Sequence, residues 1–268
     1  MESGQAAKLD LREDLPSVAD IAATIDDGQG ILEDGRFVRE MSELLDLIDE
    51  ERSNQGIEPY SYNQRVVLVH EAYRVALRYK DKRRKGRNRA GTAEERGDLV
   101  FYDHLVGATK ILVSEIGLTG LSSVIAMLNH DTVEDFVDKG LAPRDKRPRE
   151  RELYDSLVDV SFYKDKLIDF DEEEARRVFE DVKLVVEGVT KVRKATKEKE
   201  LDATVAQLLN ITRTSIRSVL IKLADRLHNL RTLDGHGDDA KGRAKQREII
   251  DVTESVYLPL ARIAGVQT

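Results

Sequence analysis

The stretch Leu128-Asn129-His130-Asp131-Thr132-Val133-Glu134-Asp135 joins an apolar segment to four side chains that can bind a metal ion or a proton. The preceding residues, from Leu121 onward, have the apolar spacing of a buried helix. If the helix continues, Glu134 lies one turn after His130, and Asp135 lies one turn after Asp131. Unpaired charge is expensive to bury, and a metal ion would compensate for it. The alternative interpretation is a solvated helix end with acidic decoration.

Two further segments place polar side chains in apolar surroundings. His104 stands at the start of a segment whose apolar residues have helical spacing. Asp225 lies within the stretch from Val219 to Leu230, which is apolar on most sides and predicts a buried helix. Asp225, Asn229 and Thr232 follow one another at i, i+4 and i+7, which places them in one polar stripe on that helix. A stripe of this kind usually lines a pocket.

The composition indicates an all-α fold class. Helical spacing recurs in three other segments, which are Val66–Ala76, Val178–Val186 and Ile249–Ile263. We find no convincing run of residues with the alternation of a strand. The 268 residues include no cysteine, which excludes disulfides and thiolate metal sites and agrees with a reducing cytoplasm. No apolar run reaches membrane-spanning length, and the N-terminus lacks the pattern of a signal peptide. We therefore expect a cytoplasmic protein that does not bind membranes.

The net charge of −8 argues against a general nucleic-acid-binding protein, which would carry a basic excess. The charge is uneven, however, because Lys82–Arg89 holds six cations in eight residues. A solvated loop is the plain interpretation of this run. Guanidinium groups can also pair with phosphates and stack on bases. The expected partner is a small anionic nucleotide, and no feature of the sequence specifies an oligomeric state.

The order His, His-Asp, Asp resembles the HD phosphohydrolase superfamily, and the flanking residues resemble the hydrolase domain of the RelA/SpoT homologues. The matching segments occur in the order of that family and cover roughly residues 60–265: Tyr102–Leu105, His130–Asp135, Val186–Lys191, Leu220–Leu233 and Glu254–Ala261. A His-Asp dipeptide alone is weak evidence, whereas the long stretch from Leu220 to Leu233 is highly specific. The resemblance implies an HD-domain helical bundle over residues 60–268.

The resemblance also implies an activity, the metal-dependent removal of the 3′-pyrophosphate from the guanosine alarmones (p)ppGpp to give GDP or GTP. One Mn²⁺ ion per chain would be held by four residues: His104, His130, Asp131 and Asp225. Glu134 and Asp135 would handle the proton, since a carboxylate beside a metal site can act as a general base. The nucleotide would be held by four others: Arg84, Lys85, Asn229 and Thr232. We interpret His228 as a core histidine hydrogen-bonded beside the site, and His70 and His236 as surface residues.

The sequence departs from the family in several places. Residue 105 is leucine where the family usually has proline, and the loop near residues 87–98 is longer than usual. A second long insertion covers roughly residues 138–170, where Pro143 and Pro148 with dense charge indicate a surface excursion. Residues 1–59 form an extra N-terminal extension, expected to be partly mobile and to contain one helix from Phe37 to Ile48.

Two alternatives to the guanosine alarmone hydrolase stay open. Another HD phosphohydrolase substrate is possible, such as an adenosine alarmone (p)ppApp, the 2′-phosphate of NADPH or a deoxynucleotide. A non-catalytic helical regulatory module is the second alternative, although all six metal and proton-handling positions are present. The chain ends just after the segment that precedes a synthetase domain in two-domain relatives, so it is either a stand-alone hydrolase or a fragment. The long insertions and the extension favour the stand-alone form.

Overall fold

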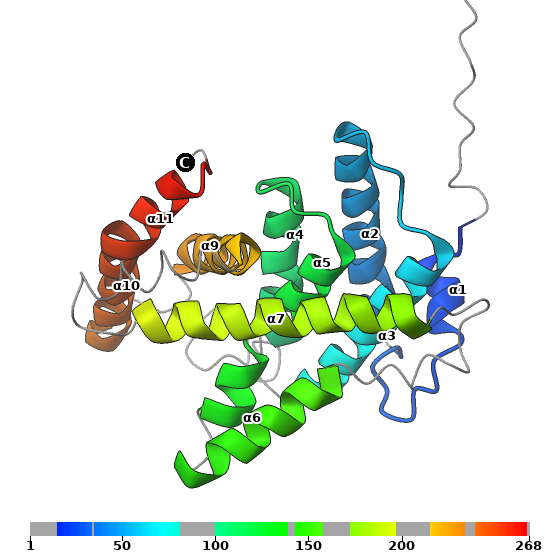
Figure 1. The fold of residues 1–268 in the computed structure, drawn as a ribbon, viewed down its shortest axis with the longest axis horizontal. Helices are drawn as coiled ribbons and strands as arrows, with labels where there is room; N and C mark the ends of the chain where they lie inside the picture. Colours follow the sequence, from blue (N-terminus) through cyan, green and yellow to red (C-terminus); the bar gives the residue numbers. More distant parts are fainter. Residues whose placement is uncertain are drawn as a thin grey trace, which may run out of the picture.

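The computed structural model describes residues 15–33, 35–80, 100–138, 143–157, 172–196, 215–233 and 239–266. All regular elements in these residues are helical, and the predicted all-α fold class is confirmed (Figure 1). The first half contains α1 (Val18–Ala22), α2 (Arg36–Asn54), α3 (Tyr62–Tyr79), the π-helical segment η1 (Phe101–Val106), α4 (Gly107–Ser114) and α5 (Leu121–Leu128). The second half contains η2 (Glu134–Asp138), α6 (Pro143–Leu157), α7 (Glu172–Thr196), α9 (Ile216–Arg231), α10 (Ala240–Val252), η5 (Thr253–Tyr257) and α11 (Leu258–Ile263).

The long helix α7 crosses the molecule and packs against α5, α9 and α6 (Figure 1). Its contact face is the apolar stripe predicted from the sequence, since Val182, Val185 and Val186 are fully buried and Val178 is partly buried. A side chain at Gly188 would not fit, because a Cβ atom there would lie 2.2 Å from Ser218 Oγ on α9. α7 and α9 therefore lie unusually close together at this point.

The N-terminal helices pack into the main apolar core. The helix predicted from Phe37 to Ile48 is part of α2, and Phe37 is fully buried. Its ring stacks on Phe101 of η1 and contacts Tyr73 of α3 edge-on, with centroids 6.1 Å apart in both pairs. Arg36 forms an ion pair of 3.0 Å with Asp103. The division into an extension of residues 1–59 and a domain of residues 60–268 remains a prediction.

One expectation about the surface is wrong. His70 was expected at the surface, but it is fully buried because α3 is covered by α1, α2, α5 and η1; His236 lies outside the described residues. The excursion marked by two prolines does lie at the surface, since Asp145, Arg149 and Arg151 are exposed, and its first part forms the charged helix α6. Pro143 begins that helix, where a missing N–H costs nothing, whereas Pro148 lies inside the helix, where it removes one hydrogen bond and its ring crowds the preceding turn.

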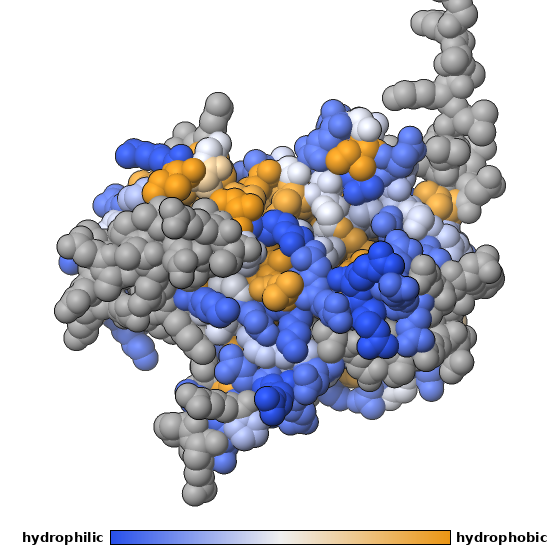
Figure 2. Space-filling view, in the orientation of Figure 1, coloured by the Kyte–Doolittle hydropathy of each residue, from blue (hydrophilic) through white to orange (hydrophobic). Residues whose placement is uncertain are grey.

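A smaller apolar cluster joins α7, α9, η5 and α11, and it includes Val192, Val219, Tyr257 and Leu260. Figure 2 shows apolar side chains gathered over α11 and toward α4, whereas much of the remaining face is polar. In the described part of the chain, none of the helices is both long and apolar enough to cross a membrane.

The close approach of α7 and α9 gives a test of the fold. We expect Gly188→Ala to lower the free energy of unfolding by about 1–3 kcal/mol, the usual cost of overpacking, because its Cβ would meet Ser218. Urea denaturation measures the change. Gly28→Ala is the matched control, since a Cβ there meets nothing within 4 Å. An unchanged midpoint for Gly188→Ala would mean that the two helices can move apart at little cost.

Candidate metal centre

Four potential metal ligands from three parts of the chain meet in one cluster. His104 comes from η1, His130 and Asp131 follow the end of α5, and Asp225 comes from the middle of α9. Their ligand atoms all lie within 4.8 Å of one another. His104, His130 and Asp225 are buried, and the side chain of Asp131 is 20% exposed. The structure thus brings together the four residues expected from the sequence.

The distances within the cluster are those of side chains that face a common centre. His104 Nε2 lies 3.1 Å from Asp131 Oδ2 and 3.4 Å from Asp225 Oδ1. His130 Nε2 lies 3.3 Å from Asp131 Oδ1 and 3.5 Å from Asp225 Oδ1. Each imidazole therefore presents its Nε2 atom to both carboxylates.

The end of α5 aims His130 into the cluster. The continuous helix expected through Asp135 is wrong, because α5 stops at Leu128 and Asn129 leaves the helical region with φ −98° and ψ 1°. In the turn that follows, His130 Nδ1 donates to the Met127 carbonyl at 2.7 Å. This bond fixes the ring so that Nε2, the nitrogen that would bind an ion, faces the carboxylates.

The side chain of Asn129 is held from two sides by α3. Its Nδ2 donates to the Ile125 carbonyl at 3.1 Å and to Glu71 Oε1 at 3.4 Å, and its Oδ1 accepts from Arg78 Nη1 at 3.1 Å. The sequence reasoning missed these supporting residues. The spacing of Glu71 and Arg78 within the apolar helix α3 is a polar stripe of the same kind as the one that begins at Asp225, and it could have revealed them.

His228 supports His104, and the prediction of a buried histidine hydrogen-bonded beside the site is confirmed. The two Nδ1 atoms lie 3.2 Å apart, and His228 is 7% exposed. With Nδ1 of His104 engaged in this way, its Nε2 faces the carboxylates. Gly107 makes room for the second ring, because a Cβ there would lie 2.7 Å from His228 Nε2.

Lys222 is a buried cation at the edge of the cluster that the sequence reasoning missed. Its Nζ donates to Asp225 Oδ2 at 2.6 Å and lies 3.9 Å from Asp131 Oδ1. Burial acts to lower the pKa of Lys222, but attraction to Asp225 and Asp131 outweighs it, so the pKa is raised. The same attraction, together with the two histidines, holds the pKa of Asp225 well below its usual value despite burial. Burial acts to raise the pKa of Asp131, but the charge of His130 and the hydrogen bond from His104 outweigh it, so the pKa is lowered.

The residues present fit a divalent metal ion. Among the described residues, His130 Nε2 is a buried nitrogen without a hydrogen-bond partner, although two carboxylates lie beside it. A buried polar atom is normally satisfied, and a metal ion would satisfy this one. Two imidazoles and two carboxylates form a donor set of the kind that divalent transition metals accept. The cluster is therefore consistent with a divalent metal site.

The other predicted site residues that the structure describes lie in η2 and toward the end of α9. Glu134 and Asp135 begin η2 and are partly buried. Burial first, then the negative charges of Asp135 and Asp131, raise the pKa of Tyr79. Asn229 Nδ2 donates to Asp225 Oδ1 at 2.7 Å.

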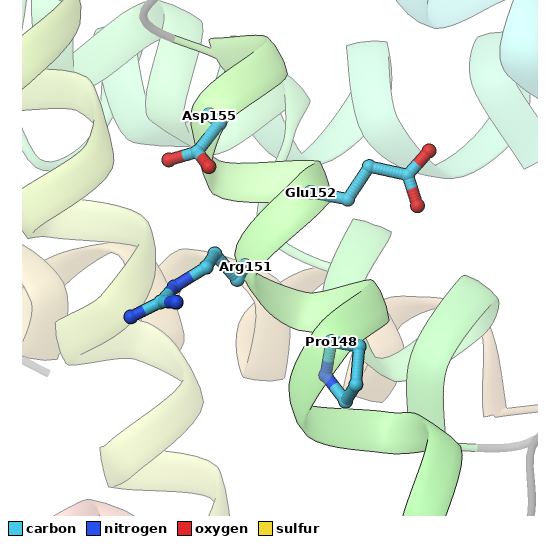
Figure 3. A pocket seen from close by; sticks show the side chains of 4 residues that line it. All are labelled: Pro148, Arg151, Glu152 and Asp155. Carbon is cyan, nitrogen blue, oxygen red and sulfur yellow. The ribbon is translucent and has the colours of Figure 1, made fainter.

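At the end of α9, the Thr232 hydroxyl donates to the His228 carbonyl at 2.9 Å. Arg84 and Lys85 lie outside the described residues. The pocket drawn in Figure 3 is lined by Pro148, Arg151, Glu152 and Asp155, all from α6, and shares no residue with the cluster. Its mixture of one cation and two carboxylates indicates no particular ligand.

Comparison with known proteins relates the chain to one family. An HD domain model matches residues 157–267, a range that includes Asp225. The chain is 30% identical to a GTP pyrophosphokinase of Streptomyces coelicolor over 216 residues, which are 80% of this chain and 20% of that protein. No solved structure matches.

Two further relatives are named as hydrolases. A guanosine-3′,5′-bis(diphosphate) 3′-pyrophosphohydrolase of Haemophilus influenzae is 35% identical over 119 residues, or 43% of this chain and 16% of that protein. A probable enzyme of the same name from Synechocystis is 38% identical over 91 residues, or 32% of this chain and 11% of that protein. The chain thus spans about a fifth or less of the length of these three relatives. Their similarity, the HD model and the His-Asp cluster agree: the chain carries an HD domain homologous to the hydrolase domains of the RelA/SpoT family.

Proposed function

We propose that this chain is a metal-dependent hydrolase that removes the 3′-pyrophosphate from (p)ppGpp, leaving GDP or GTP. The observation that carries the proposal is the buried cluster in which His130 Nε2 faces two carboxylates without a hydrogen-bond partner of its own. The names of the relatives from Haemophilus and Synechocystis support the choice of substrate.

The residues of the cluster have the role of ligands in this proposal. His104, His130, Asp131 and Asp225 hold the ion, for which Mn²⁺ is our choice. When bound, the ion supplies a Lewis acid that acidifies water and offsets the charge on the phosphate. The hydrogen bonds from His130 to Met127 and between His104 and His228 keep the two imidazoles oriented as ligands.

The remaining residues handle the proton and the nucleotide. Glu134 and Asp135 follow the ligand pair by one turn and remain partly exposed, so they can accept a proton from water at the cluster. Asn229 and Thr232 continue the polar stripe of α9 beyond Asp225 and contact the nucleotide. Arg84 and Lys85 supply positive charge for the phosphates and a flat cation for the base. The reaction takes place in the cytoplasm.

The direct experiment is a nucleotide panel incubated with the purified full chain, with and without Mn²⁺, and analysed by chromatography. We expect GDP and pyrophosphate from ppGpp only when the metal is present. Release from pppGpp, ppApp, NADPH and deoxynucleotides is measured in parallel. A clear preference for ppApp would replace the guanosine assignment, and no turnover of any nucleotide would leave the binding-module alternative.

The ligand assignment predicts loss of metal in Asp225→Ala. Turnover should be abolished and bound metal should fall, because the variant lacks one of four ligands. The unfolding free energy should also drop by about 3–5 kcal/mol, since breaking the buried ion pair leaves the Lys222 ammonium with only the more distant carboxylate of Asp131. Elemental analysis and urea denaturation measure the two effects.

Asp181→Asn is the control for this variant, because Asp181 pairs with Arg217 outside the cluster. It should keep both metal and turnover. Full metal occupancy in Asp225→Ala would exclude Asp225 as a ligand.

Glu134→Gln and Asp135→Asn separate metal binding from proton transfer. Both variants should keep the metal and the substrate, while kcat falls by about 10²- to 10⁴-fold, the usual contribution of general acid–base catalysis. Steady-state kinetics and elemental analysis measure this. Glu173→Gln, at an exposed position of α7, should behave as the unchanged chain. If both variants turn over normally, the proton is handled by other groups.

Charge reversal in the basic run tests substrate binding. Arg84→Glu combined with Lys85→Glu should raise KM strongly, because a highly charged anion must approach a chain with a net charge of −8. The dependence of KM on salt should weaken, since salt screens exposed charges. Arg176→Glu with Arg177→Glu changes the net charge equally at exposed positions of α7 and should leave KM nearly unchanged. Equal effects of the two double variants would indicate that net charge alone is responsible.

A further inference from the structure

Lys222 places a positive charge beside the cluster, where a divalent metal ion would add two further positive charges. It is 5% exposed, and it projects from α9 one turn before Asp225. A lysine is rarely buried unless its ammonium group is paired. Its Nζ donates to Asp225 Oδ2 at 2.6 Å and lies 3.9 Å from Asp131 Oδ1, so the paired groups are the two carboxylates of the cluster.

The two carboxylate oxygens of Asp225 have separate partners. Oδ1 faces the imidazoles of His104 and His130 at 3.4 and 3.5 Å and accepts a hydrogen bond from Asn229. Oδ2 accepts the hydrogen bond from Lys222. Only Oδ1 is therefore directed at the point where the histidine nitrogens converge.

We propose that Lys222 is a positioning residue that retains Asp225 Oδ2, so that Asp225 offers a single oxygen to the metal, and that its charge holds the two carboxylates together before the ion arrives. This inference rests on the proposed metal-binding function. In this role Lys222 acts through Asp225 and Asp131.

Retaining one oxygen matters for hydrolysis. A carboxylate can bind a metal through one or both oxygens, and the second oxygen takes up a coordination position. Hydrolytic metal sites keep a position open for water or for the substrate. Lys222 thus protects an open position at the cost of weaker metal binding.

The weaker binding follows from charge. Asp131 and Asp225 carry two negative charges, and Lys222 offsets one of them. Removing Lys222 takes away the positive charge that offsets one of the two carboxylates, so the site attracts a divalent ion more strongly and the chain without the ion is destabilised. Interactions between charges a few ångströms apart in a partly buried site are worth several kcal/mol, which corresponds to at least a tenfold change in affinity.

The test compares Lys222→Met with Lys245→Met in the full chain. Methionine keeps the unbranched apolar stem of lysine and removes the charge and the donors. Lys245 also pairs with an acidic residue three positions later, Glu248 at 2.9 Å, but it is exposed on α10. The measurements are the Kd of Mn²⁺ by calorimetry, the thermal midpoint with and without Mn²⁺, and kcat on ppGpp.

For Lys222→Met we expect Mn²⁺ to bind at least about tenfold more tightly, with a lower midpoint without metal, a larger rise on adding Mn²⁺ and a reduced kcat. Lys245→Met should match the unchanged chain in all four. An unchanged or weaker Mn²⁺ affinity in Lys222→Met overturns the inference, because a purely structural lysine would not restrain metal binding.

Two further results keep the test decisive. If Lys222→Met does not fold without metal, refolding in Mn²⁺ supports the inference, and failure to refold at saturating Mn²⁺ contradicts it. Lys222→Arg retains the charge and should keep the Mn²⁺ affinity of the unchanged chain. Absence of Mn²⁺ binding by the unchanged chain would instead contradict the proposed function, so the two failures are distinguishable.

Discussion

The structure depends on keeping two carboxylates close together inside a helical core. Asp225 is 4% exposed on the buried side of α9, and its ligand oxygen lies within 4.8 Å of that of Asp131. Two like charges at this separation repel strongly in a medium of low polarity. Their compensation comes from three neighbours, His104, His130 and Lys222. The two histidines are fixed by further contacts, His130 with the Met127 carbonyl and His104 with His228. The need for compensation therefore involves η1, the end of α5 and α9.

The site lies where regular helices are interrupted. His104 is in the π-helical segment η1, and His130 and Asp131 are in the turn after α5. π-Helical turns are rare and often occur at functional sites, because they redirect side chains from the regular spacing. Here the redirected side chains meet Asp225 on the regular helix α9. This helix can pack closely against α7 because Gly188 has no side chain at the point of contact. The regular helices thus position the site, and the irregular segments orient its side chains.

The sequence predicted the fold class from apolar spacing, and it predicted the four clustered residues from local signals together with the resemblance to the HD family. Apolar spacing reports helices directly, and an aspartate in an apolar helix reports a compensating site. The end of α5 was missed because Asn129 looks like an ordinary helical residue, and its side-chain bonds to Arg78 and Glu71 come from a distant segment. Lys222 was missed because lysine and aspartate three residues apart resemble a common surface pair. Its burial depends on how α9 packs, which no local pattern contains.

The same reasoning applies to the N-terminal helices, which the sequence presented as an addition. α2 contacts the segment that carries His104 through stacking of Phe37 on Phe101 and through the ion pair of Arg36 with Asp103, the residue before His104. Arg36 also lies 4.3 Å above the ring of Tyr102. The aromatic contact is buried and the ion pair is 30% exposed on both sides, so packing contributes more than charge. Because η1 is an irregular segment, its geometry needs such outside support. α2 is therefore part of what holds the first histidine of the cluster in place.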